Sequence, residues 1–160
     1  MEIILDEQPT NEQEIVYAGF WRRFAAAFLD GIIMYFFSML LLGIFGIAAM
    51  NPSDFSDPEA LGAFASNLGI YYGVSIGSTW LYHAFMESST YQASLGKMAL
   101  GIKVASADSL GRPSFGQATG RYFGKLVSSL ILGIGYLMML WNPRSQTLHD
   151  SMSGCVVIRK

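Results

Sequence analysis

The chain is organised around residues 20–31, FWRRFAAAFLDG, which open a long apolar segment running from Phe24 to Met50. Asp30 is the only charged residue within that segment. Placing a carboxylate in hydrocarbon costs roughly 2.5–3.5 kcal/mol, so such a residue usually has a partner and a role. Arg23 precedes it by two helical turns, about 10 Å of rise, on nearly the same helix face. These residues predict a membrane-spanning helix that carries a charged site.

The composition favours a membrane protein built as one compact unit. Of the 160 residues, 52% are apolar and only 14% are charged, whereas soluble domains carry roughly 25% charged residues. Residues 1–16 contain five acids and no Lys or Arg, unlike a secretory signal, which begins with basic residues. One cysteine, Cys155, permits no internal disulfide, and we expect no metal and no cofactor. Nucleic acid is not an expected partner, because no basic stripe is interleaved with aromatic residues.

Hydropathy predicts an all-α integral membrane protein whose first two helices form a transmembrane hairpin. We expect residues 1–16 to form a polar cytoplasmic tail and residues 17–159 to form a single membrane domain. The first span is predicted from Phe24 to Met50 and the second from Leu61 to Met86, each long enough to cross a bilayer. Between them, Ser56 or Asp57 can cap the second helix, with Pro58 in its first turn.

Two ladders of small residues recur at intervals of four. The first consists of Ala65, Gly69, Gly73 and Gly77, and the second of Gly116, Gly120 and Gly124. Small residues at this spacing let another helix approach closely, which is how membrane helices gain packing energy. The ladders can therefore pack helices within this chain, join copies in a homo-oligomer, or bind a partner membrane protein. The lipid bilayer is the other expected partner.

The polar residues after the second span predict a small cytoplasmic cap. Residues 100–105 alternate in the manner of a strand, and residues 108–111 indicate a turn. A capping-box pattern over residues 114–117 predicts the start of a third helix. Residues 142–143 are expected to start a short helix ending near Gly154, and residues 155–158 read as a second strand that can pair with the first.

The third apolar segment, residues 126–141, is short for a span and is interrupted by Gly133 and Gly135. A tilted crossing would place the C-terminus outside the cell, whereas a re-entrant bend near the glycines would keep it inside. All ten Lys and Arg residues fall at residues 22–23 or after residue 96. Since positive charge in short loops marks the cytoplasmic side, we favour the re-entrant arrangement with both termini inside.

The charged stretches together resemble the RDD family of bacterial multi-pass membrane proteins, named for one arginine and two aspartates. The resemblance is carried by Arg23 with Asp30 and by the later stretches SLGK (94–97), RPSFGQA (112–118) and NPRSQTLHD (142–150). It assigns the arginine to Arg23 and the aspartates to Asp30 and Asp150. It implies a small protein of the bacterial cytoplasmic membrane, with transport the usual suggestion for its function.

Two classes of function follow from these residues. The first is transport of a small ligand or a cation, with proton coupling as one form of it. In that form Asp30 is the exchange site, Arg23 tunes it, and Asp150 or Glu87 gates access. Arg23 and Asp30 are too far apart on one straight helix for an ideal direct bond. We therefore expect a bridging participant, supplied by Asp150 together with His149 or Arg144.

The second class is a non-transporting scaffold or accessory subunit, in which the same charges only fix helix packing. An enzyme is not expected. His149 and Asp150 are adjacent and point about 100° apart on a helix, and no serine or cysteine nucleophile is evidently positioned by them.

Overall fold

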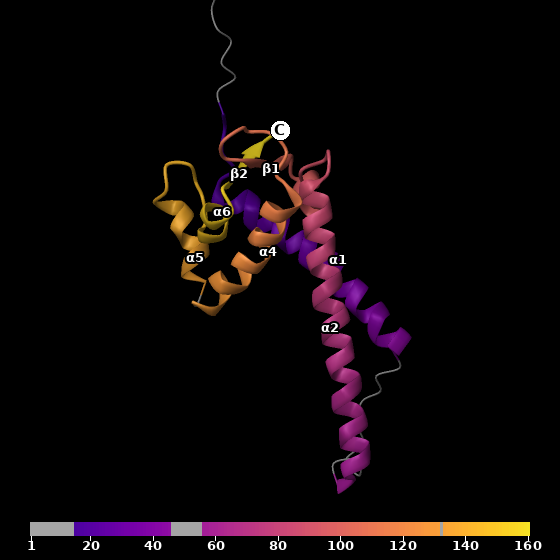
Figure 1. Ribbon diagram of the computed structural model, residues 1–160. Coiled ribbons are helices and arrows are strands. Elements are labelled where there is room, and N and C mark those ends of the chain that lie inside the picture. Colours follow the sequence, from indigo (N-terminus) through magenta and orange to yellow (C-terminus); the bar gives the residue numbers. More distant parts are fainter. Residues whose placement is uncertain (1–14, 46–55, 132) are drawn as a thin grey trace, which may run out of the picture.

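The computed structural model describes residues 15–45, 56–131 and 133–160, and it is mostly helical with one small sheet (Figure 1). Its elements in chain order are α1 (Phe20–Phe45), α2 (Pro58–Ser88), α3 (Leu95–Ala99), β1 (Ile102–Ser106), α4 (Phe115–Leu130), α5 (Ile134–Leu137), the 3-10 helix η2 (Met138–Leu140), α6 (Leu148–Met152) and β2 (Cys155–Arg159).

The two long helices, α1 and α2, extend away from the sheet and the shorter helices (Figure 1). Within Phe20–Ile44, α1 contains an 18-residue stretch with a mean hydropathy of 2.0. By length and composition it is the one continuous helix of the described residues that could cross a membrane. The α4 segment and the segment Ile134–Leu140 would qualify as a second span only if taken together. The prediction of an apolar first span is thus confirmed at the level of helix length and composition. The second predicted span, Leu61 to Met86, forms part of helix α2, but α2 is not apolar enough to qualify as a span by the same criteria.

Helix α2 begins where its sequence predicts. Asp57 is the N-cap, its carboxylate accepts a hydrogen bond from the Glu59 N–H at 2.9 Å, and Pro58 occupies the first turn. An acidic cap and Glu59 suit the positive end of the helix dipole. The predicted end of the first span at Met50, the loop residues before 56 and most of the expected tail lie outside the described residues.

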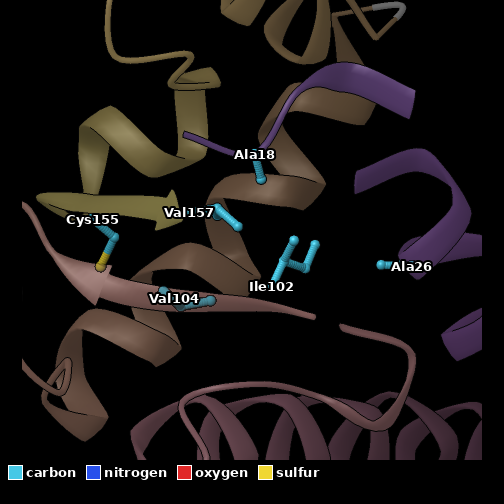
Figure 2. Close-up of a cluster of buried hydrophobic side chains, with 6 residues drawn as sticks. All are labelled: Ala18, Ala26, Ile102, Val104, Cys155 and Val157. Atoms are coloured by element: carbon cyan, nitrogen blue, oxygen red, sulfur yellow. The ribbon is translucent and has the colours of Figure 1, made fainter. Parts of the chain in front are cut away.

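The two short strands pair antiparallel, which confirms their prediction. Ile102 lies opposite Arg159 and Ser106 opposite Cys155, while Tyr17 forms an additional bridge to Ile158. The sheet therefore brings the start of the domain, the region after α2 and the C-terminus to one side. Four residues of the sheet, Ile102, Val104, Cys155 and Val157, form an apolar core with Ala18 and with Ala26 of α1 (Figure 2).

The third apolar segment bends sharply. Ser114 and Gln117 form the predicted capping box at the start of α4. After α4 the chain turns by 115°, and Gly133 adopts a left-handed φ of +75° as the N-cap of α5. A residue with a side chain is strained in that conformation, so glycine suits this turn. The chain then returns to the sheet, as the re-entrant arrangement requires.

The helix expected from residues 142–143 is a wrong prediction, because α6 begins only at Leu148. The Asn142 side chain instead accepts a hydrogen bond from the Arg144 N–H at 2.8 Å and holds a turn, in which Ser145 has a φ of +47°. Thr147 with Asp150 forms the capping box that starts α6. A local side-chain hydrogen bond thus competes with helix formation at Asn142.

The two ladders of small residues have different surroundings. A Cβ added at Gly124 on α4 would lie 2.8 Å from the Cβ of His149, so this glycine lets α6 pack closely. Gly120 is 3.8 Å from Ser153 by the same measure, and Gly116 meets only Ser114 beside it. On α2, an added Cβ at Gly69, Gly73 or Gly77 would meet no atom within 4 Å among the described residues. Within that part of the chain, the α2 ladder is open.

Candidate functional site

Asp150 lies at the centre of a network of buried charged side chains. Its carboxylate is fully buried and pairs with Arg23 from α1 and with Arg121 from α4, the latter with Nη2 2.9 Å from Oδ1. The capping box holds it in place, since Oδ2 also accepts from the Thr147 N–H at 3.3 Å. Buried carboxylates are stable as anions only when charged or polar partners surround them. Asp150 has two such charged partners, Arg23 and Arg121.

Arg23 ties the start of α1 to the C-terminal region. Besides Asp150, its Nε donates to the Ala18 carbonyl at 2.9 Å and its Nη2 donates to the Ser145 carbonyl at 2.6 Å. Planar guanidinium groups suit such simultaneous contacts because their N–H groups point outward in a fixed fork. The structure therefore contains the predicted contact between Arg23 and Asp150, which is an ion pair.

Arg121 connects this pair to a second carboxylate, Glu87, at the end of α2. Its Nε lies 3.7 Å from Glu87 Oε2. Glu87 is buried, forms an ion pair with Lys97 of α3, and lies 3.8 Å from the Lys125 Nζ of α4. Two carboxylates are therefore surrounded by four cationic side chains from three helices, α1, α3 and α4.

The electrostatics of the cap residues follow from their burial. Burial alone raises the pKa of Asp150, but Arg121 and Arg23 outweigh it and hold that pKa well below its usual range. Burial lowers the pKa of Lys97 to about 8, against the opposing effect of Glu87. Burial also lowers the pKa of His149 to about 3, so its ring is neutral at pH 7. Its nitrogens lie 3.0 Å from the Thr147 hydroxyl and 3.4 Å from the Ser128 hydroxyl.

Asp30 belongs to a separate arrangement. It is buried, and it accepts hydrogen bonds from the Ser94 hydroxyl (2.5 Å), the Gly96 N–H (2.8 Å) and the Tyr82 hydroxyl (3.2 Å). All three donors are neutral. Because Ser94 and Gly96 begin α3, the Asp30 carboxylate of α1 occupies the place of an N-cap for that helix.

The contact between α1 and α3 depends on Gly96. A Cβ built there would lie 2.3 Å from the Ala26 carbonyl oxygen and 2.9 Å from the Asp30 carboxyl carbon. No side chain fits at that separation, so the backbone of α3 can reach Asp30 only with glycine at this position. The stretch SLGK (94–97) thus supplies two hydrogen-bond donors to Asp30 and one cation to Glu87.

The structure does not form the expected bridge between Arg23 and Asp30, because each has partners of its own. Of the three supporting residues, Glu87 and His149 lie in the network, whereas Arg144 is exposed and forms no ion pair within the described residues. Sequence reasoning missed Arg121, Lys125 and Lys97 as members of the site. Their spacing offered a signal, since Arg121 and Lys125 stand one turn apart beside the small residues of α4.

A pocket of about 580 Å³ lies against this network. Its lining includes four cationic side chains, Arg23, Lys97, Arg121 and Lys125, together with Asp30 and His149. The apolar side chains of the lining, called the apolar wall below, include Phe20, Phe24, Ala27, Met34, Leu137 and Met139. The pocket therefore combines buried cations with hydrocarbon side chains. In the described parts of the chain, no group of three or more His, Cys, Asp or Glu residues could hold a metal ion.

Known proteins similar to this chain identify its family. The RDD family matches over residues 17–154, a range that includes Arg23, Asp30 and Asp150. YxaI, an uncharacterized protein of Bacillus subtilis (strain 168), is 35% identical over 153 residues, covering 89% of this chain and 97% of YxaI. YteJ, an uncharacterized membrane protein of the same organism, is 26% identical over 150 residues, covering 90% of this chain and 82% of YteJ. No solved structure matches the chain. The chain belongs to the RDD family.

Proposed function

We propose that this chain is a multi-pass protein of the bacterial cytoplasmic membrane, with its N-terminus on the cytoplasmic side. The apolar helix α1 and the relative YteJ, called a membrane protein, support a membrane location. In this arrangement α1 crosses outward, and α2 returns, since its 31 residues are long enough to span although they are less apolar than α1. The bent α4–α5 segment enters without crossing. The antiparallel sheet supports it, because β2 must lie on the same side as β1.

Within that membrane the protein transports a small ligand through the pocket beside α1. The observation that carries this proposal is the pocket of about 580 Å³ whose lining includes four cationic side chains. A purely structural ion network is expected to be matched in charge and closed to solvent. This one has more cations than carboxylates and borders a space large enough for a small molecule.

A cation is the less favoured ligand. Both oxygens of Asp30 already accept hydrogen bonds from other parts of the chain. Exchange of a cation or a proton at Asp30 would therefore disturb the start of α3. If Asp30 couples transport to protons, Asp30→Asn abolishes transport driven by a proton gradient in vesicles.

Side-specific labelling of cysteines tests the transport proposal without knowledge of the ligand. The native thiol is removed by Cys155→Ala, and Ala27→Cys or Met34→Cys places a single thiol on the pocket wall. Right-side-out and inverted vesicles are then treated with a membrane-impermeant maleimide. Transport predicts that pocket thiols react from both sides, because access must alternate.

The matched control is Phe28→Cys, since Phe28 is 62% exposed on the same helix and does not line the pocket. We expect no reaction of that thiol from either side, because lipid would cover it. Reaction of both pocket thiols from one side only would contradict transport.

The second candidate function is a scaffold or accessory subunit. It is favoured by the open ladder on α2, where Gly69, Gly73 and Gly77 meet no neighbour among the described residues. A partner helix or a second copy could pack there. One-sided labelling of the pocket, combined with constant recovery of one membrane partner that is lost on Gly73→Leu, would favour this role over transport.

A further inference from the structure

We infer that the ligand of the pocket is an amphiphilic anion, with a phosphate or carboxylate head group bound by Arg121 and Lys125 and a hydrocarbon tail along the apolar wall. This inference rests on the proposed function, because it names the class of ligand for the same pocket. It departs from the expectation of a cation. Three features of the site support it.

The first feature is the charge balance. Arg23, Lys97, Arg121 and Lys125 line the pocket, whereas Glu87 and Asp150 lie behind them. Asp30 also lines the pocket, but neutral donors already surround its oxygens. Even with Asp30 included, four cations face three carboxylates. An excess of buried positive charge is unfavourable without a counter-ion, so the site favours an anion and disfavours a cation.

The second feature is the state of Arg121. Its side chain is only 2% exposed, and its Nη2 contacts Asp150, yet its Nε and Nη1 have no hydrogen-bond partner among the described residues. Unpartnered N–H groups of a buried guanidinium are costly, and a carboxylate or phosphate satisfies two at once.

Lys125 lies one helical turn after Arg121 on α4 and also lines the pocket. Its side chain is 24% exposed, and its Nζ is 3.8 Å from Glu87 Oε1, beyond hydrogen-bond distance. The ammonium group can therefore turn toward a head group without losing a hydrogen bond to Glu87. Together, Arg121 and Lys125 present one planar and one point-like cation to the same region of the pocket.

The third feature is the apolar wall. Phe24, Ala27 and Met34 lie along α1, and Leu137 and Met139 lie on the returning segment. Phe24 is 56% exposed, so this wall continues onto the outer surface of α1, where we place lipid. A free inorganic anion would leave these side chains without a partner, whereas a hydrocarbon tail would cover them.

Thermal unfolding of the delipidated full chain in a non-ionic detergent tests the inference. The probes are dioleoyl phosphatidic acid, dioleoylglycerol with the same tails but no phosphate, and inorganic phosphate without tails. We expect phosphatidic acid near saturation to raise the Tm by about 5 °C, because a ligand that binds only the folded state stabilises it. Neither of the other probes should shift it measurably.

Variants assign the effect to the pocket. Lys125→Gln should weaken the affinity for phosphatidic acid about tenfold, as expected for loss of one charged contact, and Lys125→Arg should restore it. Arg144→Gln is the matched control, because Arg144 is exposed and does not line the pocket. An unchanged affinity in Lys125→Gln would overturn the inference.

The two control probes, dioleoylglycerol and inorganic phosphate, also test the inference. Equal stabilisation by dioleoylglycerol would remove the role of the head group, and equal stabilisation by inorganic phosphate would remove that of the tail; either result overturns the inference. Two-sided cysteine labelling without stabilisation by phosphatidic acid would contradict this inference alone. Stabilisation with one-sided labelling would contradict transport and leave the ligand class standing.

Discussion

Asp30 and Asp150, the two aspartates that the resemblance assigns to the family motif, stand in opposite environments. Asp150 is held by two arginines, Arg23 and Arg121. Asp30 has neutral donors from Ser94, Gly96 and Tyr82. Both are buried, and both sit at the beginning of a short helix: Asp150 in the first turn of α6, and Asp30 opposite the first turn of α3. Buried aspartates thus have two different roles in this protein. Asp150 balances the charge of buried cations, and Asp30 joins α1 to α3.

The largest expected difference concerns the loss of the Asp150 charge. Asp150→Ala leaves Arg23 and Arg121 buried beside each other without their shared carboxylate. We expect a loss of about 3–5 kcal/mol in the free energy of unfolding, because removing one partner strands buried charge. Thermal unfolding of the purified protein measures it. Asp108→Asn, in an exposed turn, is the control and should change stability by less than about 0.5 kcal/mol. A small effect at Asp150 would mean that the arginines have other partners.

The packing around Asp30 requires the backbones of α1 and α3 to approach closely. Gly96 is therefore the position there that is most sensitive to substitution. Gly96→Ala places a methyl group against the Ala26 carbonyl and should cost about 1–3 kcal/mol through forced separation of α1 and α3. Among the residues that the structure describes, Gly73→Ala on α2 meets no atom within 4 Å. That variant should be neutral or slightly stabilising, since alanine favours helix. Equal effects at the two glycines in a thermal unfolding assay would contradict the close contact at α3.

Neutralising Asp30 should cost less than neutralising Asp150. In Asp30→Asn one oxygen still accepts, but the new amide NH₂ replaces either the oxygen that accepts from Ser94 or the oxygen that accepts from Gly96 and Tyr82. We expect a loss of about 1–2 kcal/mol, typical of a few uncharged hydrogen bonds. The measurement is again the midpoint of thermal unfolding, compared with Asp57→Asn at the cap of α2. If Asp30→Asn were as damaging as Asp150→Ala, Asp30 would have a charged partner outside the contacts described above.

As the pH falls, we expect the region around Asp150 to lose stability first, because its neighbour His149 is harder to protonate in the folded state than in the unfolded state. The His149 pKa is lowered to about 3 by burial, whereas an unfolded histidine has a pKa near 6.5. Below pH 6.5 the unfolded state therefore binds more protons, and stability falls as the pH drops from 6.5 toward 3. At pH 5.5 the loss is about 1 kcal/mol.

The readout is the slope of unfolding free energy against pH rather than its absolute value. His149→Gln should flatten that slope between pH 6.5 and pH 5 relative to the parent. The Asp150 carboxylate itself adds no slope there, because its lowered pKa affects stability only below about pH 4. An unchanged slope in His149→Gln would show that the ring is protonated in the folded protein.

Local patterns predicted much of this architecture. The apolar run after Phe24, the Asp57 cap with Pro58, and the Ser114–Gln117 capping box are each complete within a few residues. Alternation marked the first strand, and residues 155–158 read as a second strand that could pair with it if both lay on one side of the membrane. The start of α6 was misplaced, because Asn142 forms a local turn that competes with the helix that residues 142–143 seemed to start.

The sequence by itself determined which segments are helix or strand and which polar residues sit in apolar surroundings, because those properties depend on neighbours within a turn or two. The tertiary structure decided the partners. Asp30 meets Gly96 across 66 residues, and Arg23 meets Asp150 across 127. Arg121 looked like one charge on an amphipathic helix until folding placed it between two carboxylates. Buried charges take whatever counter-charges the packed helices bring within reach, and no local pattern specifies that choice.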